Sequence, residues 1–202
     1  MNKGFTVWFT GLSGAGKTTL AHLLDKKLKE WGRNVEILDS DTVRINLCQG
    51  LGFSKQDADI SIQRIAFICK LLTRNGVAVI SVTTSPYREA RDKARREIGS
   101  FVEVYAKCPP EVCVERDITG LYQKAPKGDI GDFAGVSDPY EEPLNAEVVV
   151  ETDKETVEES VNKIFQKLTE LGYLSQTGPA EHVYSPEEED KIKERLSRLG
   201  YI

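Results

Sequence analysis

Short apolar runs rich in β-branched residues alternate with segments of helical period along most of this chain. The runs that predict strands are Phe5–Thr10, Val35–Leu38, Val77–Val82, Phe101–Tyr105 and Ala146–Val150. The segments that predict helices cover residues 19–28, 58–73, 86–96, 110–116 and 157–171. Strands that alternate with helices in this way are typical of a parallel sheet joined by crossover helices. The pattern therefore predicts an α/β fold with a five-stranded parallel sheet.

Two segments depart from this alternation. From Asp117 to Asn145, glycines, prolines, aromatic residues and charges mix without a period. Such a long irregular stretch in a compact domain is usually functional, so we expect a lid there; a disordered surface insertion is the alternative. After Gly172 comes a polar linker, then a short helix with Ser185 as its N-cap. We expect one domain over residues 1–174, with the lid at about 117–145, followed by a linker and C-terminal helix over 175–202.

The strongest chemical motif lies between the first predicted strand and the first predicted helix. Residues 11–18 read Gly-Leu-Ser-Gly-Ala-Gly-Lys-Thr, which fits the phosphate-binding pattern G-x-x-x-x-G-K-[ST]. Glycines let successive backbone N–H groups turn inward, and the helix N-terminus adds its positive dipole end. The expected nucleotide contacts are Gly11, Ser13, Gly14, Ala15, Gly16, Lys17, Thr18 and Thr19. Lys17 would reach the terminal phosphates of ATP and Thr18 would ligand Mg²⁺. The motif alone leaves kinase, GTPase and motor open.

A second group of polar residues follows the second predicted strand, where open α/β sheets bind their ligands. Asp39 and Asp41 are two positions apart, and Arg44 comes shortly after them. One carboxylate could fix the Mg²⁺ water shell while the other accepts a proton from an attacking hydroxyl. Arg44 could bind an anionic acceptor with two hydrogen bonds. The alternative for the aspartates is helix capping.

Composition limits the class of protein and the compartment in which we expect it. The chain has 202 residues, a net charge of −5 and 40% hydrophobic residues, which predicts a folded core and argues against a surface that coats nucleic acid. No apolar run approaches the roughly 20 residues of a membrane span. Because the phosphate loop begins so close to Met1, we expect no signal peptide and a cytoplasmic protein. Cys48, Cys69, Cys108 and Cys113 are most simply buried or free thiols, with a Cys108–Cys113 redox pair as the alternative.

Further motifs occur in the order typical of one enzyme family. They are Leu38-Asp-Ser-Asp-Thr-Val-Arg44, Leu51-Gly-Phe-Ser54, Ser85-Pro-Tyr-Arg88, Glu115-Arg-Asp117, Gly120-Leu-Tyr122 and Phe133-Ala-Gly-Val-Ser-Asp-Pro-Tyr-Glu141. Over about residues 4–174 the chain resembles adenylylsulfate (APS) kinase. The resemblance implies a three-layer P-loop kinase core that transfers the γ-phosphate of MgATP to the 3′-hydroxyl of APS, giving PAPS and ADP in sulfate assimilation. It also implies a homodimer, and it leaves association with ATP sulfurylase as a further partner to test.

The resemblance also assigns roles to particular residues. Asp41 matches the carboxylate near the acceptor hydroxyl, Asp39 the carboxylate on the Mg²⁺ side, and Arg44 the arginine near the phosphosulfate. Ser85 and Lys124 match a serine of the acceptor loop and a lysine of the lid that reaches phosphate, which makes Lys17, Asp39, Asp41 and Lys124 the expected catalytic set. Phe53 and Phe133 match two aromatic residues that sandwich the acceptor adenine.

The chain departs from the family pattern mainly on the acceptor side. Members usually carry Asp-Arg-x-x-Asn-Ile-Arg-Arg where this chain has Asp57-Ala-Asp-Ile-Ser-Ile-Gln-Arg64. An arginine and an asparagine expected to touch the acceptor are thus Ala58 and Ser61, and a further arginine is Gln63. Two alternatives to APS kinase follow: a kinase of this scaffold that acts on another nucleotide-like hydroxyl, and an ATP-binding module with little transfer activity.

Overall fold

The computed structural model describes residues 3–52, 54–117, 120, 122, 134–175, 191, 193–195 and 197–198, and for residues 40, 41 and 44 only the backbone. Its strands are β1 (Phe5–Thr10), β2 (Val35–Leu38), β3 (Ala78–Val82), β4 (Phe101–Lys107) and β5 (Val148–Glu151). Its helices are α1 (Lys17–Glu30), α2 (Ser40–Asn46), α3 (Lys55–Arg74), α4 (Arg88–Ile98), α5 (Pro110–Glu115) and α7 (Val157–Glu170).

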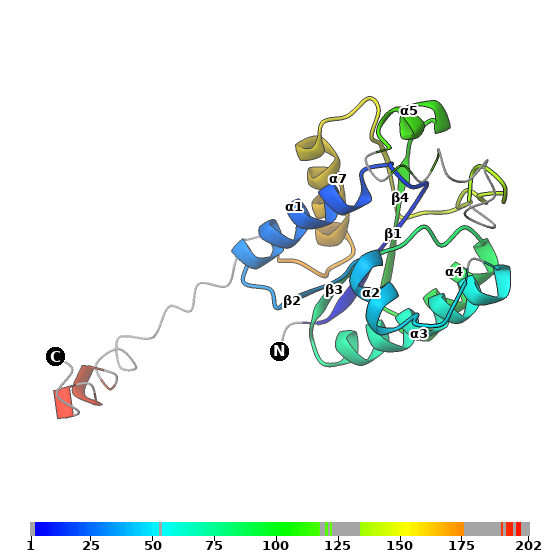
Figure 1. Cartoon of the computed structure of the whole chain (residues 1–202). Helices are drawn as coiled ribbons and strands as arrows, with labels where there is room; N and C mark the ends of the chain where they lie inside the picture. The colour runs from blue at the N-terminus through cyan, green and yellow to red at the C-terminus, as the bar shows by residue number, and fades with distance from the viewer. Residues whose placement is uncertain are drawn as a thin grey trace.

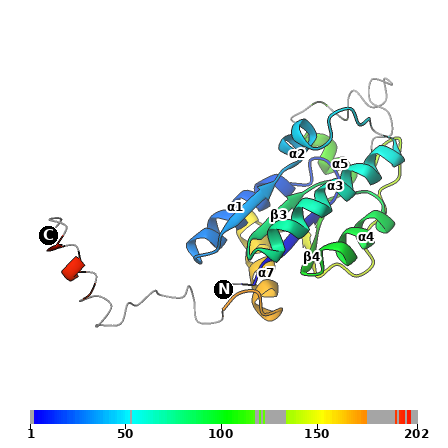
Figure 2. The same cartoon turned by 90° about the horizontal axis from the view of Figure 1, so that it is seen from below.

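The five strands form one sheet in the order β2-β3-β1-β4-β5, and every neighbouring pair is parallel. Val7 at the centre of β1 lies opposite Ile80 of β3 and Val102 of β4. Because all strands run the same way, their carboxyl ends meet at one edge, where α2 lies in the view of Figure 2. The predicted five-stranded parallel sheet is confirmed.

Helices cover both faces of the sheet and give three layers (Figure 1). On one face α1 and α7 pack together, and their buried side chains Leu24, Leu28, Ile164 and Leu168 belong to the larger hydrophobic cluster. On the other face α3 and α4 pack together, and Ile65, Cys69 and Ala94 belong to the second cluster with Trp8 of β1. Burial on both faces explains why β1 and β3 carry nearly continuous apolar runs.

The structure adds one helix that the sequence pattern missed. Helix α2 has seven residues, too few to show a helical period, and Asp39 is its N-cap. Elsewhere the elements match, with ends that differ by a few residues. The largest difference is at α3, which begins at Lys55 and not Ala58, while α4 begins at Arg88 and not Pro86 and β5 begins at Val148 and not Ala146. β5 is an edge strand paired only with β4, which leaves fewer ladder contacts to fix its start.

Two sets of described residues lie outside the core elements. Between residues 134 and 145 there is an isolated bridge that joins Ala134 to Asp138. The described residues of the C-terminal part, 191, 193–195 and 197–198, are helical and exposed. Among all described residues, no helix has both the length and the apolar character that crossing a membrane would need.

Candidate active site

The phosphate loop follows β1 at the carboxyl edge of the sheet, and its glycines are required by the surrounding backbone. Gly14 has φ +77°, and a Cβ atom there would lie 2.8 Å from the carbonyl oxygen of Cys113 in α5. Gly11 has φ +143°, and a Cβ atom there would lie 2.5 Å from the carbonyl oxygen of Ala106. Larger residues would therefore push the loop away from β4 and α5. The loop has the strand–loop–helix setting that its motif requires.

Lys17 is the first residue of α1 and its side chain is buried inside the loop. Its Nζ donates to the carbonyl oxygens of Gly11 at 2.8 Å and Leu12 at 2.7 Å. Burial lowers the pKa of the Lys17 ammonium to about 8. An ammonium held this way lies among the groups that would face the phosphates, and negative phosphate oxygens would stabilise its charged form.

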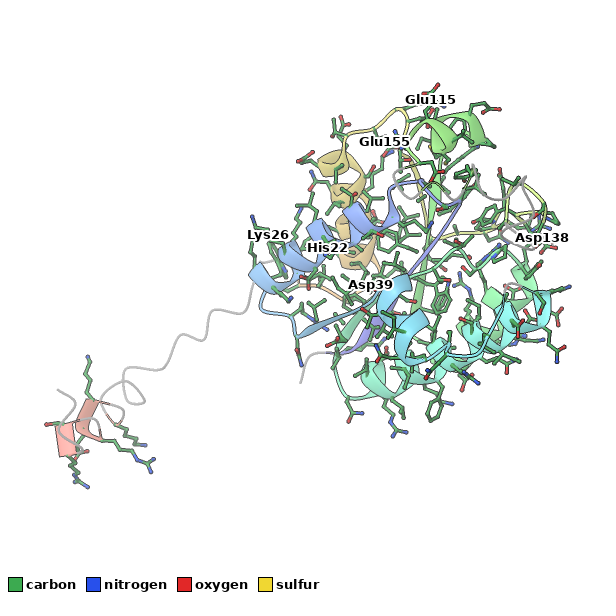
Figure 3. All side chains as sticks on the ribbon, in the orientation of Figure 1. His22, Lys26, Asp39, Glu115, Asp138 and Glu155 are labelled. Carbon is green, nitrogen blue, oxygen red and sulfur yellow. The ribbon has the colours of Figure 1, made fainter. Side chains whose placement is uncertain are left out.

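The residues predicted to hold magnesium lie at the same edge. Thr18 and Thr19 are exposed in the first turn of α1. Asp39, labelled in Figure 3, follows β2, and its Oδ1 accepts a hydrogen bond of 2.7 Å from the N–H of Thr42. The capping alternative for Asp39 is thus confirmed, but a carboxylate has further acceptor positions free for a second task. A hydroxyl and a carboxylate are the hard oxygen donors that suit Mg²⁺, so this donor set fits the ion.

The loop after β3 lies between the phosphate loop and Asp39, because β3 lies between β1 and β2 in the sheet. Ser85 in this loop has φ +38°, a left-handed conformation that is rare for a residue with a side chain. Its hydroxyl is buried: it accepts from Trp8 Nε1 at 3.1 Å and donates to Thr10 Oγ1 at 3.0 Å. The Ser85 hydroxyl therefore shapes the loop, and its predicted contact with the acceptor stays a prediction.

A segment in the C-terminal part of the predicted lid, residues 138–142, is hydrogen-bonded to this loop. The hydroxyl of Tyr87 donates to the carboxylate of Asp138, which Figure 3 labels on the side of the molecule where α4 begins. The N–H of Glu141 donates to the carbonyl oxygen of Pro86 at 2.9 Å, and the N–H of Arg88 donates to Glu141 Oε2 at 2.8 Å. Two segments that are far apart in sequence thus form one wall of the site.

Sequence reasoning missed several side chains that shape this site. Thr10 is buried at the end of β1, and its hydroxyl donates to the Thr84 carbonyl at 2.7 Å and pairs with the Tyr140 hydroxyl at 2.9 Å. Tyr122 is also buried, and its hydroxyl donates to the Ser13 carbonyl in the phosphate loop at 2.9 Å. Burial raises the pKa of Tyr122 above its usual range. A polar residue at the end of an apolar strand was the available signal for Thr10.

The altered positions of α3 separate into two environments. The Ser61 hydroxyl lies 2.9 Å from the Cys48 thiol, and Ala58 packs on the second hydrophobic cluster. Gln63 instead lines a shallow pocket between α3 and α4, together with Asp59, Lys93 and Glu97. Gln63 therefore lies in other surroundings than Ser61 and Ala58, and its expected place on the acceptor side stays a prediction. Residues 61 and 63 point to different faces because two residues along a helix turn about 200°.

Five predicted site residues lie wholly or partly outside the described structure, and the four cysteines lie within it. Asp41 and Arg44 belong to α2, but their side chains lie outside the described structure. Phe53, Lys124 and Phe133 also lie outside the described residues. All four cysteines are buried and free, which confirms the simplest interpretation of the sequence. Burial raises the pKa of the Cys113 thiol to about 12, so that this thiol stays protonated beside the phosphate loop.

The family model described as adenylylsulphate kinase matches residues 3–151 of the chain. The adenylyl-sulfate kinase of Rippkaea orientalis is 58% identical over 173 residues, which cover 86% of this chain and 96% of that protein. A Sorangium cellulosum protein, the probable bifunctional SAT/APS kinase 2, is 52% identical over 177 residues, 88% of this chain but 30% of that protein. The solved structure of Mycobacterium tuberculosis APS kinase CysC in complex with AMPPNP and APS superimposes with a TM-score of 0.79 at 35% identity, covering 84% of this chain and 99% of that one. The chain therefore belongs to the adenylylsulfate kinase family.

Proposed function

We propose that this chain transfers the γ-phosphate of ATP to the 3′-hydroxyl of adenosine 5′-phosphosulfate, giving PAPS and ADP, with Mg²⁺ as cofactor. The observation that carries the proposal is the phosphate loop with its enclosed Lys17, at the same sheet edge as Asp39 and α2. The match to a family member that holds AMPPNP and APS supports the choice of both nucleotides.

The donor half of the reaction rests on the loop between β1 and α1. Its backbone N–H groups and Lys17 would hold the phosphates of ATP, while Thr18 and Asp39 would hold Mg²⁺, Asp39 directly or through a water molecule. When bound, Mg²⁺ neutralises negative charge on the phosphates. Lys124 of the lid would add a further cation near the transferred phosphoryl group. Phosphoryl transfer depends mostly on such positioning and charge neutralisation.

The acceptor half rests on residues that follow β2 and β3. Asp41 would accept the proton of the 3′-hydroxyl as that oxygen attacks the γ-phosphorus, and Arg44 would pair with the phosphosulfate. Phe53 and Phe133 would stack on either side of the acceptor adenine. Ser85 would shape the neighbouring wall. In this assignment α2 supplies both the proton acceptor and the anion-binding arginine, so its position sets the geometry of attack.

A kinase for another nucleotide-like hydroxyl is the second candidate, and Ala58 and Ser61 favour it. Where the family pattern has an arginine and an asparagine, this chain has a methyl group in a hydrophobic cluster and a hydroxyl that pairs with Cys48. Losing a charge-assisted hydrogen bond to an anion costs about 1.5–3 kcal/mol, or roughly one to two decades of affinity. An acceptor with a smaller or less anionic tail would lose less from these two changes.

One assay separates these candidates: ADP release from MgATP alone, with APS, and with a panel of other nucleotides. Turnover that depends on APS supports the proposal, turnover only with another acceptor selects the second candidate, and no stimulation by any acceptor indicates an ATP-binding module. With MgATP and the acceptor that gives turnover, Asp41→Asn should retain ATP binding and lower kcat by about 10²–10⁴-fold. A kcat close to that of the wild type would exclude Asp41 as the base.

The matched variant for the acceptor pocket is Ala58→Arg. It should lower the KM for APS if the pocket only lacks a charge, and leave that KM unchanged if the pocket fits other groups. We also propose a cytoplasmic homodimer and an association with ATP sulfurylase. Light scattering of the purified chain, alone and mixed with ATP sulfurylase, tests both assemblies; a monomeric mass that the sulfurylase does not change would refute both.

A further inference from the structure

Helix α4 carries a buried arginine that has no part in the roles assigned so far. The side chain of Arg91 is 2% exposed, and its Nε donates to Glu103 Oε1 of β4 at 2.8 Å. The desolvation of two buried ions often cancels their mutual attraction, so a buried pair is weak grounds for a purely stabilising role. The other contacts of the guanidinium point to a second role.

The two remaining nitrogens of Arg91 join two separate segments. Nη1 donates to the carbonyl oxygen of Ser85 at 2.5 Å, and Nη2 donates to the carbonyl oxygen of Glu141 at 2.6 Å. One carbonyl belongs to the left-handed loop after β3, and the other belongs to segment 138–142 in the C-terminal part of the predicted lid. A planar guanidinium carries its donors on three separate nitrogens in fixed directions, whereas the three donors of lysine share one nitrogen, so lysine would not reproduce this set of contacts.

The location of these two segments connects the arginine to the acceptor. In the sheet, the loop after β3 lies between the phosphate loop and the start of α2. Ser85 keeps its unfavourable φ because its hydroxyl and its carbonyl are both held, by Trp8, Thr10 and Arg91. Strain that surrounding contacts hold in place is a frequent feature of functional sites.

We propose that Arg91 is a positioning residue for the phosphoryl acceptor. By bonding to both the Ser85 loop and segment 138–142, Arg91 holds them as one rigid wall beside the attacking hydroxyl. The proposal rests on the proposed function for the identity of the acceptor. Glu103 fixes the direction of the guanidinium, and the guanidinium fixes the two carbonyls. Lys17 is not bonded to either segment, because its ammonium donates to the carbonyls of Gly11 and Leu12 within the phosphate loop itself.

The test compares Arg91→Lys with a matched control, Arg95→Lys, one turn further along α4. Arg95 belongs to the same charge network: it contacts Glu103 at 3.2 Å and pairs with Glu147 at 2.6 Å. Its recorded hydrogen bonds go to these two glutamates, not to Ser85 or Glu141. Glu103→Gln is a third variant, for use if Arg91→Lys folds poorly. It keeps the size of the side chain and an acceptor for Arg91 Nε.

The first readout is hydrogen–deuterium exchange of the full chain without substrates. We expect Arg91→Lys to speed exchange by about tenfold or more in both residues 84–88 and residues 138–142, because one charge-assisted contact to each segment is weakened. Glu103→Gln should have the same effect in smaller measure, and Arg95→Lys should change neither segment. Faster exchange in only one segment, or equal effects from Arg95→Lys, would overturn the proposal.

The second readout is steady-state kinetics with APS. Arg91→Lys should raise the KM for APS by about 10–100-fold, the loss expected for one such contact, while the KM for ATP stays within about twofold. Equal changes in both KM values would indicate a general structural role and would refute the positioning role. If the wild type does not use APS, the proposed function fails, and the exchange experiment still decides whether Arg91 joins the two segments.

Discussion

The lowered pKa of Lys17 predicts that ATP binding weakens in mildly alkaline solution. Burial brings the pKa of this ammonium to about 8 in the free protein, whereas ATP binding requires the charged form beside the phosphates. If the neutral form contributes nothing, affinity falls by the factor 1 + 10^(pH − pKa), which is about twofold at pH 8 and about tenfold at pH 9. The neighbouring Cys113 and Tyr122 have raised pKa values and stay neutral in this range.

Isothermal titration calorimetry with MgATP between pH 7 and pH 9.5 measures this effect. At pH 8.5 each ATP should bring about three quarters of a proton, seen as a dependence of the heat on the ionisation enthalpy of the buffer. Lys17→Arg is the control, because a guanidinium stays charged throughout the range and its affinity should not fall with pH. A dissociation constant that stays within twofold across the range, or the same slope in Lys17→Arg, would refute the assignment.

The same group predicts an opposite trend for the stability of the free protein. The pKa of Lys17 is lower in the folded than in the unfolded chain, so the unfolded chain binds more protons between about pH 8 and 10.5. The free energy of unfolding should therefore rise through this window by up to about 3 kcal/mol from this group. Below pH 8 the buried ammonium costs that amount in full. Denaturant unfolding at pH 7.5 and pH 9.5, in wild type and in Lys17→Met, measures the difference.

Three further predictions use other parts of the molecule. Gly14→Ala and Gly16→Ala both place a side chain at a positive φ, which should cost each variant about 1–2 kcal/mol of stability in urea unfolding. In Gly14→Ala the new methyl group also meets the Cys113 carbonyl, so the total loss should be clearly larger than in Gly16→Ala. Because the pKa of Cys113 is about 12, its thiolate at pH 8 should be about 10³-fold scarcer than that of an exposed cysteine, and peptide mapping after alkylation of the folded chain should find it unlabelled. Thr156→Ala removes the hydrogen bond that the Glu159 N–H donates to the Thr156 hydroxyl at the start of α7, while the backbone N–H of residue 156 can still donate to the Glu159 carboxylate; the change should cost about 1 kcal/mol, seen as a lower Tm with unchanged kinase kinetics.

The local pattern of residues was enough to predict the core of the fold. Each strand of the sheet is an apolar run whose length suits a buried parallel strand, and each long helix has an apolar stripe or a capping residue at its start, such as Ser54 for α3. These signals act within a few residues of each other, so the sequence determines them directly. Helix α2 was missed because seven residues carry too little period, although its N-cap Asp39 was already singled out.

The phosphate loop, too, could be predicted from the sequence, because its chemistry depends on consecutive residues. Lys17, Thr18 and the glycines need only the strand before them and the helix after them. The low pKa of Lys17, by contrast, comes from burial by the assembled core, and no local pattern reports it. The position of Gln63 in the pocket between α3 and α4 is likewise not reported by any local pattern, because the packing between elements decides which face of α3 meets α4.

The sequence by itself determined the order of the elements, the phosphate loop and the family to which the chain belongs, since each follows from contiguous residues. Only the tertiary structure decided that the sheet places the loop after β3 between β1 and β2, and that Arg91 joins Ser85 to Glu141 fifty residues away. Contacts between distant segments depend on how the sheet and helices pack together. The spacing of residues along the chain does not predict that packing, so the contacts of Arg91 in α4 could be found only in the tertiary structure.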